Sequence, residues 1–158
     1  MTRHPSNYVT GFTKRVFLSH FIQFRWYDHV GDLQRIKDDM YRELTAWKAK
    51  YPEKLLMVTE YGADTISGFH TLPSSIWTED YQWALMEQTT EAFDQFANQT
   101  QGWVGEMIWN FADFMTQQQI NRAVGNKKGI FTRQRQPKAS AYMLRKRYWK
   151  LASLADEQ

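Results

Sequence analysis

The stretch of sequence that decides the fold is LLMVTEYG, residues 55–62. Its first four residues are all apolar, so a strand formed here would be apolar on both faces. This pattern is typical of a buried strand in a parallel sheet, because a strand with one exposed face alternates apolar and polar residues. We therefore predict a buried parallel strand over residues 55–59 that ends at Glu60, Tyr61 and Gly62.

Helical patterns flank this strand on both sides. Apolar residues recur at spacings of three and four over residues 33–51, and Asp32 stands where an N-cap is expected. A second helical face runs over residues 79–96, with Thr78 as its expected N-cap and acidic residues in its first turn. The central strand should therefore lie between two amphipathic helices.

The same alternation continues toward the C-terminus. Residues 103–109 form a second candidate for a buried strand, a long polar loop covers residues 112–135, and Pro137 starts a last helix. Alternating helices and strands indicate a parallel sheet with right-handed crossovers. Two strands do not complete such a sheet, so we expect part of a larger α/β body. Residues 1–24 show neither helical nor strand periodicity, and we expect regular structure to begin near Trp26.

Length and composition exclude several classes of protein. The chain has 158 residues, 42% hydrophobic and 23% charged, which is typical of one globular domain and not of a disordered or fibrous chain. It has no cysteine, so disulfides, thiolate metal sites and cysteine nucleophiles are excluded. No apolar run approaches the roughly 20 residues that span a bilayer, and no targeting segment is evident.

The carboxyl ends of the two predicted strands are the places where chemistry is expected. In parallel α/β folds, ligands bind at this edge of the sheet. Glu60 puts a carboxylate at the end of an apolar strand, where it serves either in catalysis or as a structural partner of the loop. After the second strand, Asn126 and Lys128 lie two residues apart between Gly125 and Gly129, which allow the backbone to approach a ligand closely.

Three motifs carry a resemblance to a known family. They are TEYGADT at residues 59–65, IWNFADF at residues 108–114 and GNKKGIFTR at residues 125–133. Together they resemble the C-terminal part of the catalytic barrel of the β-glucuronidases of glycoside hydrolase family two, most of all the animal lysosomal enzymes. The resemblance implies an α/β fold that is the C-terminal portion of a (β/α)8 TIM barrel, about two to three βα units, incomplete as an isolated chain.

The resemblance also implies boundaries along the chain. Residues 25–152 would belong to the barrel domain, and residues 153–158 would form a tail. Residues 1–24 would be an irregular and non-homologous N-terminus, because the family's strand end does not occur there.

The same resemblance assigns roles to particular residues. Glu60 matches the nucleophile of a retaining glycosidase that acts on terminal β-D-glucuronides. Asn126 and Lys128 match the pair that recognises the glucuronate carboxylate, which suits an amide and an ammonium donor. The other implied substrate-binding residues are Arg122, Trp109 and Tyr27.

One part of the family's catalytic machinery has no match in this sequence. A retaining mechanism needs a second carboxyl, about 5–5.5 Å from the nucleophile, as general acid and base. In the family this residue belongs to an Asn-Glu dipeptide, and the sequence contains none. Asp113 and Glu106 are expected to be structural, and His70 to be a solvated loop residue. We therefore expect the isolated chain to be inactive.

The resemblance implies no metal ion or organic cofactor and a glucuronide or a glucuronic-acid-containing glycan as substrate. It also implies homo-oligomers for full-length members, a lysosomal or secretory location, and no membrane or nucleic-acid partner. A family-two enzyme for neutral sugars is one alternative. The other is a non-catalytic nucleic-acid-binding module built on the basic residues 133–150, since ten basic residues and two acids lie between Asn121 and the C-terminus.

Overall fold

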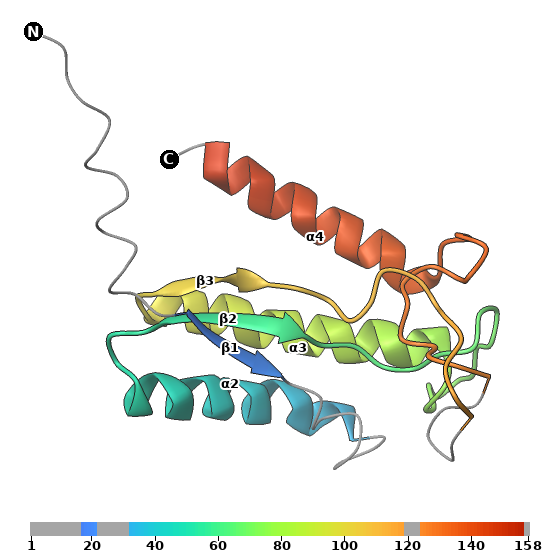
Figure 1. Cartoon of the computed structure of the whole chain (residues 1–158), viewed down its shortest axis with the longest axis horizontal. Helices are drawn as coiled ribbons and strands as arrows, with labels where there is room; N and C mark the ends of the chain where they lie inside the picture. The colour runs from blue at the N-terminus through green and yellow to red at the C-terminus, as the bar shows by residue number, and fades with distance from the viewer. Residues whose placement is uncertain (1–16, 22–31, 119–123, 157–158) are drawn as a thin grey trace, which may run out of the picture.

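The structure is a computed structural model that describes residues 17–21, 32–118 and 124–156. Within these residues, parallel strands form a sheet in the order β1-β2-β3, and the crossovers between them are helical (Figure 1). This is the predicted partial α/β architecture. The elements are β1 Phe17–Phe21, α2 Leu33–Lys50, β2 Leu55–Glu60, α3 Glu79–Gln99, β3 Trp103–Glu106 and α4 Ala139–Asp156.

The two predicted N-caps differ in the structure. Thr78 has an extended backbone, and its hydroxyl oxygen accepts a hydrogen bond from the backbone N–H of Tyr81 at 3.1 Å, as predicted. Asp32 precedes α2, but its side chain makes no capping hydrogen bond. Its ψ of 81° is not extended, and its carboxylate lies 4.0 Å from the Arg35 guanidinium instead. Asp32 is thus the N-cap residue by position, as predicted, but its side chain does not supply the capping hydrogen bond.

The central strand is confirmed, and the strand after α3 is shorter than predicted. Pairing of β3 with β2 covers Trp103–Glu106. Its register shifts between Leu56 and Met57, so that Leu56 pairs with Trp103 and Met57 pairs with Gly105. Beyond Glu106 the chain still follows β2, through hydrogen bonds from Met107 N to Val58 O at 2.8 Å and from Trp109 N to Tyr61 O at 2.9 Å. The segment after β3 thus reaches the same edge of the sheet as Glu60.

Strand β1 corrects the expectation that residues 1–24 have no regular structure. Phe17–Phe21 pairs in parallel with β2, with Phe17 opposite Leu55. Sequence periodicity missed this strand because its formation depends on pairing with β2, a contact between distant parts of the chain. The predicted boundary near residue 25 stays a prediction.

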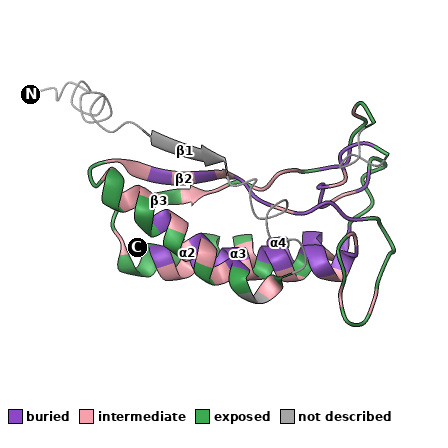
Figure 2. Cartoon of the chain, turned by 90° about the horizontal axis from the view of Figure 1, so that it is seen from below, coloured by how far each residue is buried: buried purple, intermediate pink, exposed green. Residues whose placement is uncertain are grey.

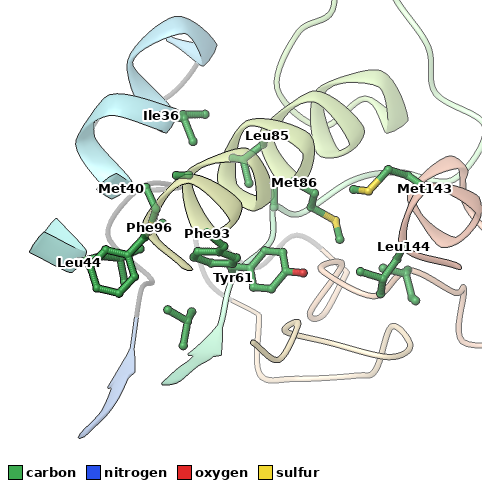
Figure 3. Packing of buried hydrophobic residues seen from close by; sticks show 14 of the residues in the cluster. Ile36, Met40, Leu44, Tyr61, Leu85, Met86, Phe93, Phe96, Met143 and Leu144 are labelled. Carbon is green, nitrogen blue, oxygen red and sulfur yellow. The ribbon is translucent and has the colours of Figure 1, made fainter. Parts of the chain in front are cut away.

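The helices cover one face of the sheet, so the molecule has two layers with the core between them (Figure 2). Helix α3 lies between α2 and α4 and contributes more large buried side chains than any other helix or strand (Figure 3). Ring contacts such as that between Tyr61 and Phe93, with centroids 5.2 Å apart, tie the end of β2 to α3. The core residues include Ile36, Met40, Leu44, Leu56, Val58, Tyr61, Leu85, Met86, Phe93, Phe96 and Leu144.

The last helix is buried over part of its predicted apolar face. Ala141 and Leu144 are buried against the core, whereas Tyr148 and Leu151 are 40% and 38% exposed. None of the helices in the described residues is long and apolar enough to cross a membrane.

Candidate active site

Three segments that are distant in the sequence meet at the carboxyl end of the sheet. They are residues 60–65 after β2, residues 107–114 after β3, and residues 124–131 (Figure 1). Backbone hydrogen bonds join them, so their relative positions are set by the main chain. These bonds run from Trp109 N to Tyr61 O (2.9 Å), from Thr65 N to Lys127 O (3.0 Å) and from Asn110 N to Lys128 O (3.2 Å).

Glu60 is the last residue of β2, and its side chain is 7% exposed. Within the described residues, its Oε2 atom is a buried acceptor without a hydrogen-bond partner. Burial raises the pKa of the Glu60 carboxyl above its ordinary value, and the charge of Lys128 partly opposes this. A buried carboxylate with an unused oxygen and a cation within electrostatic reach is an arrangement suited to nucleophilic chemistry.

Asn126 and Lys128 are both buried, at 3% exposure each. The Asn126 side-chain oxygen accepts a hydrogen bond from the backbone N–H of Lys128 at 3.0 Å, which fixes the turn between them. The structure therefore brings Asn126, Lys128 and Glu60 to one end of the sheet, as the sequence predicted.

The glycines beside this pair serve a different purpose from the one expected. A Cβ at Gly129 would lie 2.3 Å from the backbone nitrogen of Asp113, and one at Gly125 would lie 2.5 Å from the carbonyl oxygen of Phe114. Gly125 also has a φ of +96°. Both glycines thus allow the loop to pack against residues 112–115 of the chain itself, rather than against a ligand.

Trp109 follows β3 and is half-buried. Its ring makes an edge contact with Phe114, with centroids 6.3 Å apart. Its carbonyl oxygen lies so close to Gly62 that a Cβ there would be 2.6 Å away, and Gly62 has a φ of +144°. The Trp109 backbone therefore packs directly against Gly62, which lies two positions after Glu60. Tyr27 and Arg122, the two other predicted site residues, lie outside the described residues.

The other carboxylates near this edge have structural partners, as expected. Glu106 makes hydrogen bonds of 2.8 and 2.6 Å with the Arg147 guanidinium and accepts a 2.7 Å bond from the Tyr61 hydroxyl. Asp113 forms an ion pair of 2.8 Å with Lys138. His70 is exposed and pairs with Asp80 at 3.0 Å.

Sequence reasoning missed the side chains that support the loop from below. Lys138 was counted only among the basic residues 133–150 that start in the loop before the last helix, yet it is fully buried. Asp64 accepts a 2.7 Å hydrogen bond from the backbone N–H of Lys127, and Gln82 donates to the carbonyl oxygens of Ala63, Lys128 and Gly129. Asp64 lies in the TEYGADT motif, but no role was assigned to it, and no pattern marks Gln82 or Lys138. Their roles depend on how α3 and the start of α4 pack under the loop.

Comparison with known proteins shows the family to which the chain belongs. The sequence pattern described as glycosyl hydrolases family 2, TIM barrel domain, matches residues 4–153. The chain belongs to glycoside hydrolase family 2. Its described strands and helices are a part of that family's TIM barrel, which confirms the predicted fold class.

Relatives of this family-2 chain are β-glucuronidases. The enzymes of Pongo abelii and Homo sapiens are each 49% identical over 130 residues, which cover 82% of this chain and 20% of theirs. The solved structure of β-D-glucuronidase from Dictyoglomus thermophilum superimposes with a TM-score of 0.75 at 43% identity, covering 85% of this chain and 22% of that one. A β-glucuronidase from Ruminococcus gnavus, solved in complex with uronic deoxynojirimycin, gives a TM-score of 0.73 at 37% identity, covering 85% and 22%. The family-2 chain thus spans about a fifth of the length of these relatives.

Proposed function

We propose that this chain carries the nucleophile and the carboxylate-recognition site of a retaining glycosidase that hydrolyses terminal β-D-glucuronides. The observation that supports this most directly is the meeting of Glu60 with Lys128 and Asn126 at the carboxyl end of the sheet. The substrate would be a small glucuronide or the glucuronic acid end of a glycan.

The proposed chemistry follows from these positions. Glu60 attacks the anomeric carbon, a covalent glycosyl-enzyme forms as the leaving group departs, and water then hydrolyses the intermediate. Lys128 and Asn126 donate charge-assisted hydrogen bonds to the C6 carboxylate, which a neutral hexose lacks. Trp109, Arg122 and Tyr27 complete the sugar pocket in this proposal.

We infer that the general acid and base comes from outside the described residues. Inside them, Asp64, Asp113 and Glu106 are each engaged by backbone or side-chain donors. A carboxyl held in this way does not exchange a proton readily with a leaving group. The chain alone should then fail to hydrolyse unactivated glucuronides, and a complete enzyme would add the missing group. We also propose a lysosomal or secretory location and homo-oligomers for the full-length protein.

The alternatives fit the geometry less well. An enzyme for neutral sugars would make no use of the Lys128 ammonium at C6, because a hydroxymethyl group carries no charge for it to bind. A nucleic-acid-binding surface on residues 133–150 loses two of its cations, because Lys138 is buried and Arg147 is bound to Glu106 and Asp94.

Labelling of the full chain with 2-deoxy-2-fluoro-β-D-glucuronyl fluoride tests the proposal. Fluoride leaves without a proton donor, so the missing acid does not prevent formation of the ester. We expect one glucuronyl adduct on Glu60, located by peptide mass spectrometry, and its loss in Glu60→Gln. The corresponding glucosyl fluoride should label at least about tenfold more slowly, because it gains nothing from Lys128. An adduct on another carboxylate, or equal rates with both sugars, would contradict the proposal.

A further inference from the structure

A buried ion pair lies directly beneath the loop that carries Asn126 and Lys128. The Lys138 ammonium is 2.8 Å from Asp113 Oδ1, and the two residues are 0% and 5% exposed. Neither residue is needed for the proposed chemistry. Replacing a buried ion pair by apolar residues is often neutral or stabilising, so stability alone is a weak explanation for this one.

The contacts of the pair converge on the backbone on either side of Lys128. Lys138 Nζ donates to the carbonyl oxygen of Lys127 at 3.0 Å and to that of Thr65 at 3.2 Å. Asp113 Oδ1 accepts from the backbone N–H of Gly129 at 3.1 Å. The peptide groups before and after Lys128 are therefore both attached to one rigid, buried charge pair.

This attachment also joins the loop to the strand that carries the nucleophile. Thr65 follows β2 by a few residues, and its backbone N–H donates to the same Lys127 carbonyl at 3.0 Å. Burial lowers the pKa of Lys138, and the nearby Asp113 carboxylate opposes this by favouring the charged ammonium. Loss of Asp113 would leave the buried Lys138 without its carboxylate, and loss of Lys138 would leave Asp113 with only the Lys127 ammonium, at 3.8 Å, as a cationic partner among the described residues. In either case the loop would lose part of its anchor.

We propose that Asp113 and Lys138 are positioning residues that hold Lys128 where it receives the carboxylate of the substrate, and thereby set the preference for acidic over neutral sugars. This inference rests on the proposed function. It adds a specificity role for two residues that touch no substrate. Their effect should be seen in the discrimination between sugars and not in sugar binding as such.

The test compares two inhibitors that differ only at C6. Uronic deoxynojirimycin carries the carboxylate, and deoxynojirimycin carries a hydroxymethyl group. We measure the dissociation constants of both for the full chain and its variants by calorimetric titration. In Lys138→Met we expect the preference for the uronic compound to fall about tenfold or more, because a small displacement of Lys128 weakens an oriented contact steeply. Affinity for the neutral compound should stay within about twofold.

Three further variants complete the test. Asp113→Asn keeps an oxygen for the Gly129 N–H and for Lys138, so it should retain more of the preference than Lys138→Met. Glu106→Gln weakens a different buried ion pair, that with Arg147, and should leave the preference unchanged. If Lys138→Met does not fold, Asp113→Asn carries the test, with a smaller loss of preference expected. Lys128→Met serves as the reference and should abolish the preference.

The outcomes separate the inference from the function on which it rests. Loss of preference in Lys128→Met but not in Lys138→Met or Asp113→Asn would overturn the inference and leave the proposed function intact. Equal losses of affinity for both inhibitors would show a merely structural role and would also overturn it. A wild-type chain without preference would overturn the proposed function and the inference with it.

Discussion

At the scale of single residues, the protonation state of Glu60 decides its use as a nucleophile. Its pKa is raised by burial and lowered by the charge of Lys128. In Lys128→Met the lowering contribution is lost, so the pKa rises further and the carboxylate forms at a higher pH. Below that pKa the rate of nucleophilic attack falls about tenfold per pH unit, so the acidic limb of the rate profile should move to higher pH.

This shift is measured from the rate of Glu60 labelling as a function of pH, from acidic solution to neutral. The neutral 2-deoxy-2-fluoro-β-D-glucosyl fluoride is the reagent of choice, because lost carboxylate binding then does not disturb the profile. Lys127→Met is the matched control, since the Lys127 ammonium lies 3.8 Å from Asp113 and does not contribute to the pKa of Glu60. An unmoved limb in Lys128→Met would show that the two side chains do not interact.

The residues at the site differ in how far the sequence predicts them. Glu60 was singled out because it ends a recognisable apolar strand, at the edge of the sheet where ligands bind. The roles of Asn126 and Lys128 were implied by the resemblance of their motif to the family, and all three roles stay predictions. Lys138 and Asp64 were not predicted, because nothing local distinguishes a buried lysine or aspartate from a solvated one. Their roles arise when the start of α4 packs under residues 125–129, a contact between distant segments.

At the scale of helices and strands, the two N-caps give a direct comparison. Thr78→Ala removes the 3.1 Å bond to the first turn of α3 and should destabilise the chain by about 1 kcal/mol. Asp32→Ala should cost less than about 0.5 kcal/mol, because the Asp32 side chain caps nothing and its contact with Arg35 is exposed. Urea unfolding of the full chain measures both. Equal losses would contradict the assignment of Thr78 as the cap that matters.

Local patterns predicted α2, β2 and α3 closely, because the two helices have apolar residues at a helical period and β2 is a short continuous apolar run. Local patterns failed where strand pairing or packing between distant segments determines the structure. Strand β1 exists through its pairing with β2, and β3 loses regular pairing beyond Glu106, where the chain passes Gly62 to form the site. The outer half of α4 has apolar residues that the described part of the chain leaves exposed.

At the scale of the whole molecule, the described sheet has the site at the carboxyl ends of its strands and helices on one face (Figure 2). Within it, β1 and β3 each pair with β2 alone. In a closed family-2 barrel, both would have a second neighbour, and the other strands would bring their own carboxyl ends to the same opening. The proposed division of labour follows from this geometry. The proposed nucleophile Glu60 and the proposed carboxylate-binding residues Asn126 and Lys128 lie in this part of the barrel. The general acid and base would face them from across the barrel.

That division predicts how the full chain handles an activated substrate. With β-D-glucuronyl fluoride, Glu60 forms an ester bond to the anomeric carbon as the C–F bond breaks. Water then reacts slowly, because no base removes its proton, whereas azide attacks the same carbon without needing one and breaks the ester bond. We expect azide to raise the rate of fluoride release by about tenfold or more, because general base catalysis typically contributes about 10²–10⁴-fold to attack by water.

The product of this reaction should be β-D-glucuronyl azide, identified by mass spectrometry and by the coupling of its anomeric proton, and Glu60→Gln should give none. Two displacements at one carbon explain why the β configuration is kept. Fast hydrolysis without azide, at the rate seen with it, would mean that a carboxyl of this chain already activates water. The proposal of an acid and base from across the barrel would then be wrong. Asp113→Asn and Glu106→Gln would identify the carboxyl that acts as the base, because only its substitution would restore the dependence of the rate on azide.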